Sequence, residues 1–470
     1  MKHLFLCALM GLVLAAPAMA QYCAPRNSQA PTTVAWPNTP FEEPVWQMEF
    51  LPPSSSTGTA GSGLEIRNVK YNGRLVMKRG HVPILNVKYE SGCNCFRDWS
   101  YSDEVFLADN PVETCYAEST PGTVQTMCDA APSNCSDNNG DGEVDSCSDV
   151  GSFEGVAVER FPDMLRLTTH YNAGWYRYTM KWEFHRDGTI RPLYGFATTG
   201  SACTQNPRRH HAYWRFDFDI EGAESDYIVE TNAVGGNVVF ENETLRTWGD
   251  PSDGVTWSVL DVATERGYRV APGAADYDTP ANPNTGMPDV DNFVNEDAVI
   301  ARYQPGEIDD GGGSCSARFD SGSPQIVNDE SVYDTDVVLW YRSGSTKPDI
   351  DPGTCYVVGP VLTPLGDWSV TPPVATDESA TPTGFTLEDA YPNPFDRTTT
   401  VRFSVDEAQP VTLTLYDSVG RAVRTLYEGT PPAGALQTVV MDGSDLPSGV
   451  YTIRLEGESI AGTTRVVLLK

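Results

Sequence analysis

Apolar and polar residues alternate in short runs along most of the chain. Residues 64–69 (LEIRNV), 401–405 (VRFSV) and 451–455 (YTIRL) show the pattern. Alternation with a period of two is typical of strands that bury one face, and Val, Ile, Tyr, Phe and Thr favour such strands. The 41 glycines and 35 prolines interrupt the runs, and helical periodicity is hard to find. The pattern therefore predicts an all-β protein built from antiparallel sandwiches.

Composition divides the chain into five segments. Residues 1–20 combine Lys2, an apolar run over 4–16 and an Ala-Met-Ala end, which predicts a signal peptide. Residues 21–62 are rich in Pro, Ser and Thr and are expected to be irregular, whereas 63–368 should form the main β domain. Residues 369–383 (SVTPPVATDESATPT) predict an extended linker before a last unit, 384–470. No run after the signal peptide reaches the roughly 18 apolar residues of a membrane helix, so we expect no membrane span.

The net charge excludes some classes of binding partner, and the cysteine content indicates the compartment in which the protein folds. The formal net charge is -32, which disfavours nucleic acid and anionic membranes as partners. The acidic surface fits either solubility in a salty habitat or a cationic partner. Of the 11 cysteines only Cys7 lies in the predicted signal peptide. The even number that remains predicts up to five disulfides in an exported protein, with the pairing left open.

The last unit carries a specific set of motifs. It contains AYPNPF at 390–395, LPSGVY at 446–451 and a final RVVLLK. The unit closely resembles the type A sorting domain of the type IX secretion system of Bacteroidetes. The resemblance implies a small Ig-like β-sandwich that contacts the type IX secretion machinery through 384–470. It also implies a protein that is secreted or attached to the outer-membrane surface, after its signal peptide has directed it to the periplasm. Whether the unit is then cleaved or anchored stays open.

A second set of motifs lies in the main domain. Tyr-x-Tyr at 176–178 runs into W-x-F-x-x-D-G-x-I at 182–190, and two histidines precede Arg-x-Asp at 215–217. This order resembles the catalytic domain of copper amine oxidases. The resemblance implies a large antiparallel β-sandwich (a supersandwich), a homodimer, and copper bound by three histidines. It also implies a tyrosine that copper and oxygen convert to topaquinone, which oxidises a primary amine to an aldehyde with release of ammonia and peroxide.

The family's quinone position falls on Tyr176, but its surroundings depart from the family pattern. Trp175 and Arg177 stand where the family has an Asn and an acid. An inward-facing structural tyrosine is therefore the competing interpretation of Tyr176. For the family's catalytic base the sequence offers only Asp98, with Asp103 as the other acid nearby.

The family's copper pair falls on His210 and His211, which are adjacent instead of separated by one residue. Successive side chains of a strand point to opposite faces, so both could bind one ion only if a β-bulge turned one of them. No histidine follows His211, so the family's third ligand is missing. His170 lies six residues before Tyr176, with the same strand parity, and is the candidate substitute.

An independent calcium motif lies at 137–145 (DNNGDGEVD). Oxygen ligands at alternate positions and Gly142 match an EF-hand-type loop. Position 12 is Ser148 in place of the bidentate Glu, so an Asx-rich turn without calcium is the alternative. Cys135 and Cys147 flank the loop. The proposed ligands are Asp137, Asn139, Asp141, Glu143 and Asp145.

Three functions remain in view. The leading one is an exported, amine-oxidase-like protein with a degenerate, non-catalytic copper and quinone site. The first alternative is an active copper/topaquinone oxidase of a primary amine. The second is a calcium-stabilised adhesin or a protein that binds a surface glycan through exposed tryptophans, for which the candidates are Trp99, Trp175, Trp214 and Trp248.

Overall fold

The chain divides into two compact units, Met1–Val370 and Thr371–Lys470. The computed structural model describes residues 30–39, 42–57, 62–89, 93, 95–98, 103–113, 115–129, 135–136, 146–199, 203–204, 208–247, 250–273, 276, 296–309, 319–320, 324–347, 355–369, 385–387, 390–393, 395–417, 421–457 and 461–468. The expected signal peptide and most of the expected linker lie outside these ranges.

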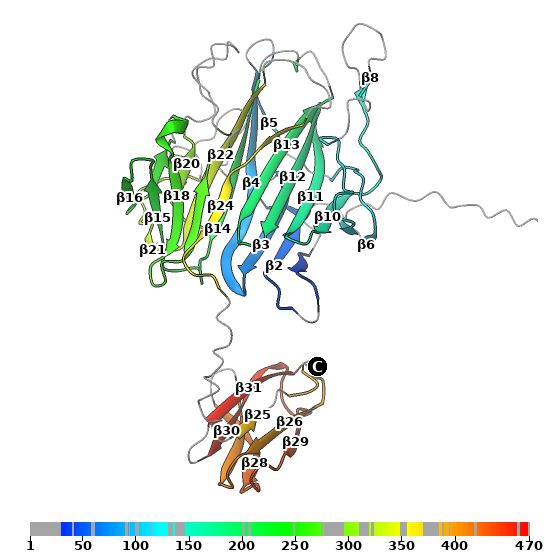
Figure 1. Ribbon diagram of the computed structural model, residues 1–470, viewed down its shortest axis with the longest axis vertical. Helices are drawn as coiled ribbons and strands as arrows, with labels where there is room; N and C mark the ends of the chain where they lie inside the picture. Colours follow the sequence, from blue (N-terminus) through cyan, green and yellow to red (C-terminus); the bar gives the residue numbers. More distant parts are fainter. Residues whose placement is uncertain are drawn as a thin grey trace, which may run out of the picture. The chain divides into compact units, whose positions relative to one another are not determined.

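The first unit contains two large sheets (Figure 1). The 9-stranded sheet has the order β1 (Thr32–Trp36), β2 (Trp46–Leu51), β3 (Ser62–Tyr71), β4 (Arg74–Tyr89), β14 (Arg208–Phe218), β22 (Val337–Lys347), β20 (Ala298–Arg302) and β17 (Thr244–Arg246), with β5 (Cys95–Asp98) paired to β4. Two short 3-10 helices, η1 (Pro53–Ser55) and η3 (Pro251–Asp253), also lie in the described part of this unit.

The second sheet has 13 strands. Its order is β16 (Asn237–Val239), β15 (Asp226–Thr231), β18 (Thr256–Asp261), β19 (Gly267–Ala271), β24 (Val361–Leu365), β13 (Ile190–Thr198), β12 (Tyr176–His185), β11 (Met164–Ala173), β10 (Gly155–Arg160), β7 (Cys115–Ser119) and β6 (Pro111–Glu113), with β21 (Tyr333–Thr335) on β15 and β23 (Tyr356–Val358) on β13. Named strands pair antiparallel except β7 with β10. A separate hairpin joins β8 (Cys135–Ser136) and β9 (Ser146–Cys147).

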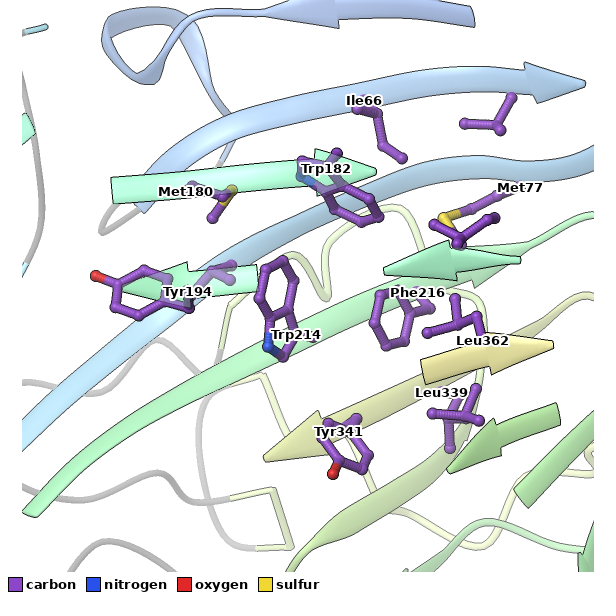
Figure 2. Packing of buried hydrophobic residues seen from close by; sticks show 14 of the residues in the cluster. Ile66, Met77, Met180, Trp182, Tyr194, Trp214, Phe216, Leu339, Tyr341 and Leu362 are labelled. Carbon is purple, nitrogen blue, oxygen red and sulfur yellow. The ribbon is translucent and has the colours of Figure 1, made fainter. Parts of the chain in front are cut away.

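Aromatic side chains from the two sheets form the core of the first unit (Figure 2). Every second residue of β12 from Tyr176 to Phe184 belongs to this core, and Trp182 meets Trp214 of β14 at right angles with ring centroids 5.4 Å apart. Phe216 packs on the same face of β14 as Trp214. Burial of a large aromatic side chain is among the strongest contributions to a sandwich core, and edge-to-face pairs add to it. The alternation in the sequence therefore has its physical reason in this shared core.

The segment 21–62 is not irregular throughout, which corrects our expectation. Within it β1 and β2 pair with each other, and β2 pairs with β3. Trp36, Trp46 and Phe50 are buried in the core of the first unit. The apolar side chains at alternate positions predict these strands better than the Pro/Ser-rich composition of the segment does. Composition is an average over strands and turns, so it hides a short strand between two turns.

Disulfides join distant parts of the first unit. Cys93 is bonded to Cys203, and Cys128 to Cys355. Cys95, Cys115 and Cys147 are disulfide-bonded as well. The prediction of disulfides is thus confirmed, although the spacing in the sequence could not give the pairs.

The second unit is a small β-sandwich with its own core. One sheet has β25 (Phe385–Leu387), β26 (Thr398–Val405) and β29 (Gln437–Asp442), and the other has β28 (Ala422–Gly429), β27 (Val411–Tyr416), β30 (Gly449–Gly457) and β31 (Ala461–Leu468). Phe403, Leu413 and Ile453 are fully buried between them. Both units are all-β, so the predicted fold class is confirmed.

A buried carboxylate network stabilises the 9-stranded sheet. Glu65 is inaccessible to solvent and lies 2.5 Å from Arg67 Nε, 3.2 Å from Arg79 Nε and 3.3 Å from His81 Nδ1. Burial alone would raise the pKa of Glu65, but the hydrogen bond with His81 and the nearby positive charges hold this pKa well below its ordinary value of 4.5. The ionised form is therefore built into the folded state.

We expect Glu65→Gln to lower the free energy of unfolding at pH 7 by about 3 kcal/mol, because it removes the buried charge that Arg67 and Arg79, both partly exposed, are paired with. The folded-state pKa is depressed, so this stabilisation is present above pH 4.5 and is lost as the pH falls below it. The gap between wild type and variant, measured by chemical denaturation, should shrink between about pH 5 and pH 3. Glu221→Gln, which breaks half-exposed ion pairs, is the control and should lose far less stability. A gap that does not change with pH would contradict the assignment.

Candidate functional site

Tyr176 lies at the start of β12, directly after a turn at Gly174, whose φ of +60° favours glycine. Its side chain is 1% exposed and faces the inside of the sandwich. Tyr89 Oη donates a 2.8 Å hydrogen bond to Tyr176 Oη, and Trp175 Nε1 donates one of 2.8 Å to Tyr89 Oη. The Tyr176 ring stacks on Tyr178, with centroids 5.6 Å apart. The structure thus gives Tyr176 the environment of a packed, hydrogen-bonded core tyrosine.

His210 meets Tyr176 from the opposite sheet. It lies on β14 and is buried, and its ring is edge-on to Tyr176 at 4.5 Å. The imidazole stacks on Phe196 of β13, with ring centroids 3.8 Å apart. Of the sequence-predicted residues, the structure brings Tyr176 and His210 together.

His211 points to the other face of β14. Its Nε2 lies 3.0 Å from Nη1 of Arg342, whose Nε donates to Asp297 at 3.1 Å. A guanidinium can only donate, so His211 Nε2 must accept, and its lone pair is taken up by this bond. His210 and His211 pair in continuous register with both neighbouring strands. The register shifts of β14 begin only after Tyr213, so no bulge turns the two imidazoles to one side.

His170 lies on the outer face of the 13-stranded sheet, which corrects our parity argument. In the β11–β12 hairpin Tyr171 pairs with Tyr178, and His170 pairs with Thr179. Counting six residues back from Tyr176 ignores the turn, which resets the register. His170 Nε2 lies 3.1 Å from Asp149 Oδ1, and Nδ1 lies 3.4 Å from Thr179 Oγ1. It therefore does not approach Tyr176 or His210.

The described residues do not fit a copper site of three histidines. Copper needs imidazole nitrogens that converge on one point, and His170, His210 and His211 lie on three different faces. Arg208, which is fully buried on the same face of β14 as His210, holds its guanidinium carbon 5.8 Å from the centroid of the Tyr176 ring. A permanent positive charge beside the tyrosine opposes a dication there. Sequence reasoning missed Arg208, although its place two residues before His210 was available as a signal.

The remaining residues named from the sequence do not complete the site. Asp98 pairs with Leu85 through the backbone of β5, and the environment of its side chain is not described. Asp103 is buried near Ser54, and burial raises its pKa to about 6. The five proposed calcium ligands of 137–145 lie between β8 and β9, outside the described residues. Cys135 and Cys147, at the ends of that loop, are partners in the β8–β9 pair.

Of the four tryptophans considered for a glycan face, Trp214 is fully buried, so it cannot contact a sugar. Trp175 is partly exposed, and Trp99 and Trp248 are not among the described positions.

A carboxylate cluster that the sequence analysis missed lies at the end of β14. Asp217, Asp219 and Asp336 offer oxygens that all lie within 4.8 Å of one another. Asp217 is 1% exposed; its Oδ2 is 3.3 Å from Arg215 Nη1, and its Oδ1 has no hydrogen-bond partner among the described residues. Hard oxygen donors in this arrangement suit Ca²⁺. The available signal was the Asp-x-Asp spacing, which puts two carboxylates on one side of a strand.

Electrostatics single out the same cluster. Burial, and then the charge of Asp217, raises the pKa of Asp219 to about 7. Burial and the charges of Asp217 and Asp219 raise the pKa of Asp336 to about 8. Carboxylates that are this difficult to ionise together would gain from a bound cation.

Comparison with known proteins supports the two resemblances to different extents. Residues 389–469 match the family model of the secretion system C-terminal sorting domain. A search of curated proteins found no match. No helix among the described residues is long and apolar enough to cross a membrane.

Several solved amine oxidases are similar to the chain in structure. They are the amine oxidase of Aspergillus nidulans (15% identity, TM-score 0.46, covering 78% of this chain and 55% of that one), the copper-containing benzylamine oxidase from Hansenula polymorpha (13%, 0.42, 68% and 59%) and Pichia pastoris lysyl oxidase (13%, 0.46, 83% and 56%). The chain spans a little over half the length of these structures. The expected similarity to copper amine oxidases is thus found at low sequence identity, a level that does not bear on what this chain binds or converts.

Proposed function

We propose that the protein is exported through a type IX secretion system and acts outside the cell as a binding or structural β-sandwich without copper/quinone chemistry. The observation that carries the proposal is the placement of His170, His210 and His211 on three different faces. The resemblance of the main domain to copper amine oxidases then concerns its scaffold, with a degenerate site.

Export is supported by the second unit. Its residues 389–469 match the sorting-domain model, and the sequence predicts a signal peptide at the other end. Disulfides such as Cys93–Cys203 are typical of an oxidising environment. The protein would therefore be secreted or attached to the outer-membrane surface.

The loss of oxidase chemistry is supported by the surroundings of Tyr176. Quinone formation in the family requires copper beside this tyrosine. Here Tyr176 has one imidazole and one guanidinium as neighbours. The residues that replace the family's motif have structural contacts instead: Trp175 donates to Tyr89, and Arg177 Nε lies 2.9 Å from Asp149 on the outer face. An active primary-amine oxidase remains the alternative, because His210 does lie beside Tyr176.

A calcium-stabilised surface protein is a second candidate that agrees with the first. It is favoured by the unpartnered Oδ1 of Asp217 within the cluster of Asp217, Asp219 and Asp336. Calcium there would join the end of β14 to the residue that precedes β22, and so hold two neighbouring strands of the 9-stranded sheet together.

The copper test uses the full chain without its signal peptide, incubated aerobically with Cu²⁺ and freed of excess metal. We expect well under one copper per chain, an unmodified mass for the peptide that contains Tyr176, and no peroxide from benzylamine. Stoichiometric copper, together with a mass gain of two oxygens and loss of two hydrogens that disappears in Tyr176→Phe, would establish the oxidase instead.

Removal of residues 371–470 should abolish export, because the sorting unit would be the part that the secretion machinery recognises. In a host with a type IX system, we expect the full chain in the medium or on the cell surface and the shortened chain in the periplasm, measured by immunoblot of fractions. A protease-resistant first unit in the periplasm would show that retention is not misfolding. Export of the shortened chain would contradict the assignment.

Calcium, added after chelation, should raise the free energy of unfolding by about 2.7 kcal/mol at a hundredfold excess over its Kd. Asp336→Asn should remove this stabilisation, because it deletes a ligand charge while keeping the side-chain shape. Asp141→Asn, in the loop between β8 and β9, is the matched control and should keep it. Full stabilisation in Asp336→Asn would exclude the cluster, and its loss in Asp141→Asn would assign calcium to the loop.

A further inference from the structure

A pocket of about 330 Å³ lies beside Tyr176, at the end of the sandwich. One side comes from β4 and β5, with Val87, Tyr89 and Phe96, and the other from the β11–β12 turn, with Trp175 and Tyr176. This volume is at the lower end of the range for small-molecule sites. The pocket therefore has room for a ligand of about one ring.

The aromatic walls are fixed by contacts with one another. Phe96 is edge-on to Tyr89, with centroids 6.1 Å apart at 82°, and edge-on to Trp175 at 5.8 Å and 88°. Phe96 is 38% exposed, whereas Tyr89 and Tyr176 are buried. Rings set at right angles present both faces and edges to a planar guest, and such contacts favour another aromatic ring. The Phe96 ring is the part of this wall most open to solvent.

One row of polar groups crosses the apolar wall. Trp175 Nε1 donates to Tyr89 Oη, which donates to Tyr176 Oη. A small number of placed polar groups in an apolar pocket orients a ligand and selects its functional group. A hydroxyl on the guest could join this row, because a phenolic oxygen can both donate and accept.

Charge decides between ligand classes. None of the described lining residues is an acid. Among the described lining residues, Arg97 alone carries a charge. It pairs with Asn86 while Phe96 pairs with Val87, so its side chain lies on the opposite face of the sheet from Phe96. Its Nε donates to Asn86 Oδ1 at 3.2 Å. The guanidinium is thus directed away from the pocket.

Among the described lining residues, none directs a charge into the pocket that would compensate an ionic guest for its lost hydration. We propose that this pocket binds a small, uncharged aromatic compound that carries one hydroxyl group. The inference rests on the proposed function in one respect, which is that Tyr176 remains an unmodified tyrosine.

The test is calorimetric titration of the full chain, without copper and under argon, with p-cresol, benzylamine, benzoate and choline at pH 7. We expect p-cresol to bind one per chain and about tenfold more tightly than any of the three ions. Phe96→Ala should weaken p-cresol binding about tenfold by removing one wall, while Tyr333→Ala, which truncates an exposed aromatic elsewhere, should not change it.

Three results would overturn the inference: no p-cresol binding to the folded chain, equal binding by Phe96→Ala, or tighter binding of benzylamine, benzoate or choline. The mass of the Tyr176 peptide in the same sample separates this failure from that of the proposed function. A modified Tyr176 would refute the non-catalytic assignment whatever binds, whereas an unmodified Tyr176 without p-cresol binding would refute the pocket assignment alone.

Discussion

The alternation of side chains along the paired strands of the two large sheets is the constraint on which the rest of the first unit depends. On β12 and β14 it sends one row of aromatic residues into the shared core, where Trp182 meets Trp214. Shifting either strand by one residue would exchange its core face for its outer face, so the buried aromatic area pins the register. The same register sets the face of the sheet to which every other side chain of β14 points, including those of His210 and His211. Neither histidine can be turned without disturbing the core.

Because of this constraint, the side chains around Tyr176 are held in place by contacts with one another. The inward row of β14 supplies His210 and Arg208 to the tyrosine, and the neighbouring β4 supplies Tyr89. The outward row carries His211 to Arg342. The two adjacent histidines and their neighbour Arg208 are thus engaged in stacking, in a hydrogen bond and in a contact with the Tyr176 ring. These surroundings agree with the proposed recognition of a neutral ring.

Much of the fold could be predicted from the sequence, because period-two alternation reports directly on a half-buried strand. The same rule correctly separated His210 from His211. It failed for His170, because a hairpin turn resets parity and its length is not visible in a count of residues. It could not find the cluster of Asp217, Asp219 and Asp336, because Asp336 joins the other two only through the pairing of β14 with β22. Long-range pairing of this kind is decided by the whole core and not by local pattern.

The most direct test of the account is an experimental structure of the exported protein crystallised with Cu²⁺, with anomalous scattering recorded at the copper edge. We predict His210 stacked on Phe196, His211 bonded to Arg342, and no anomalous peak between them. A copper ion bound by both imidazoles, with β14 bulged to bring them to one face, would contradict the account.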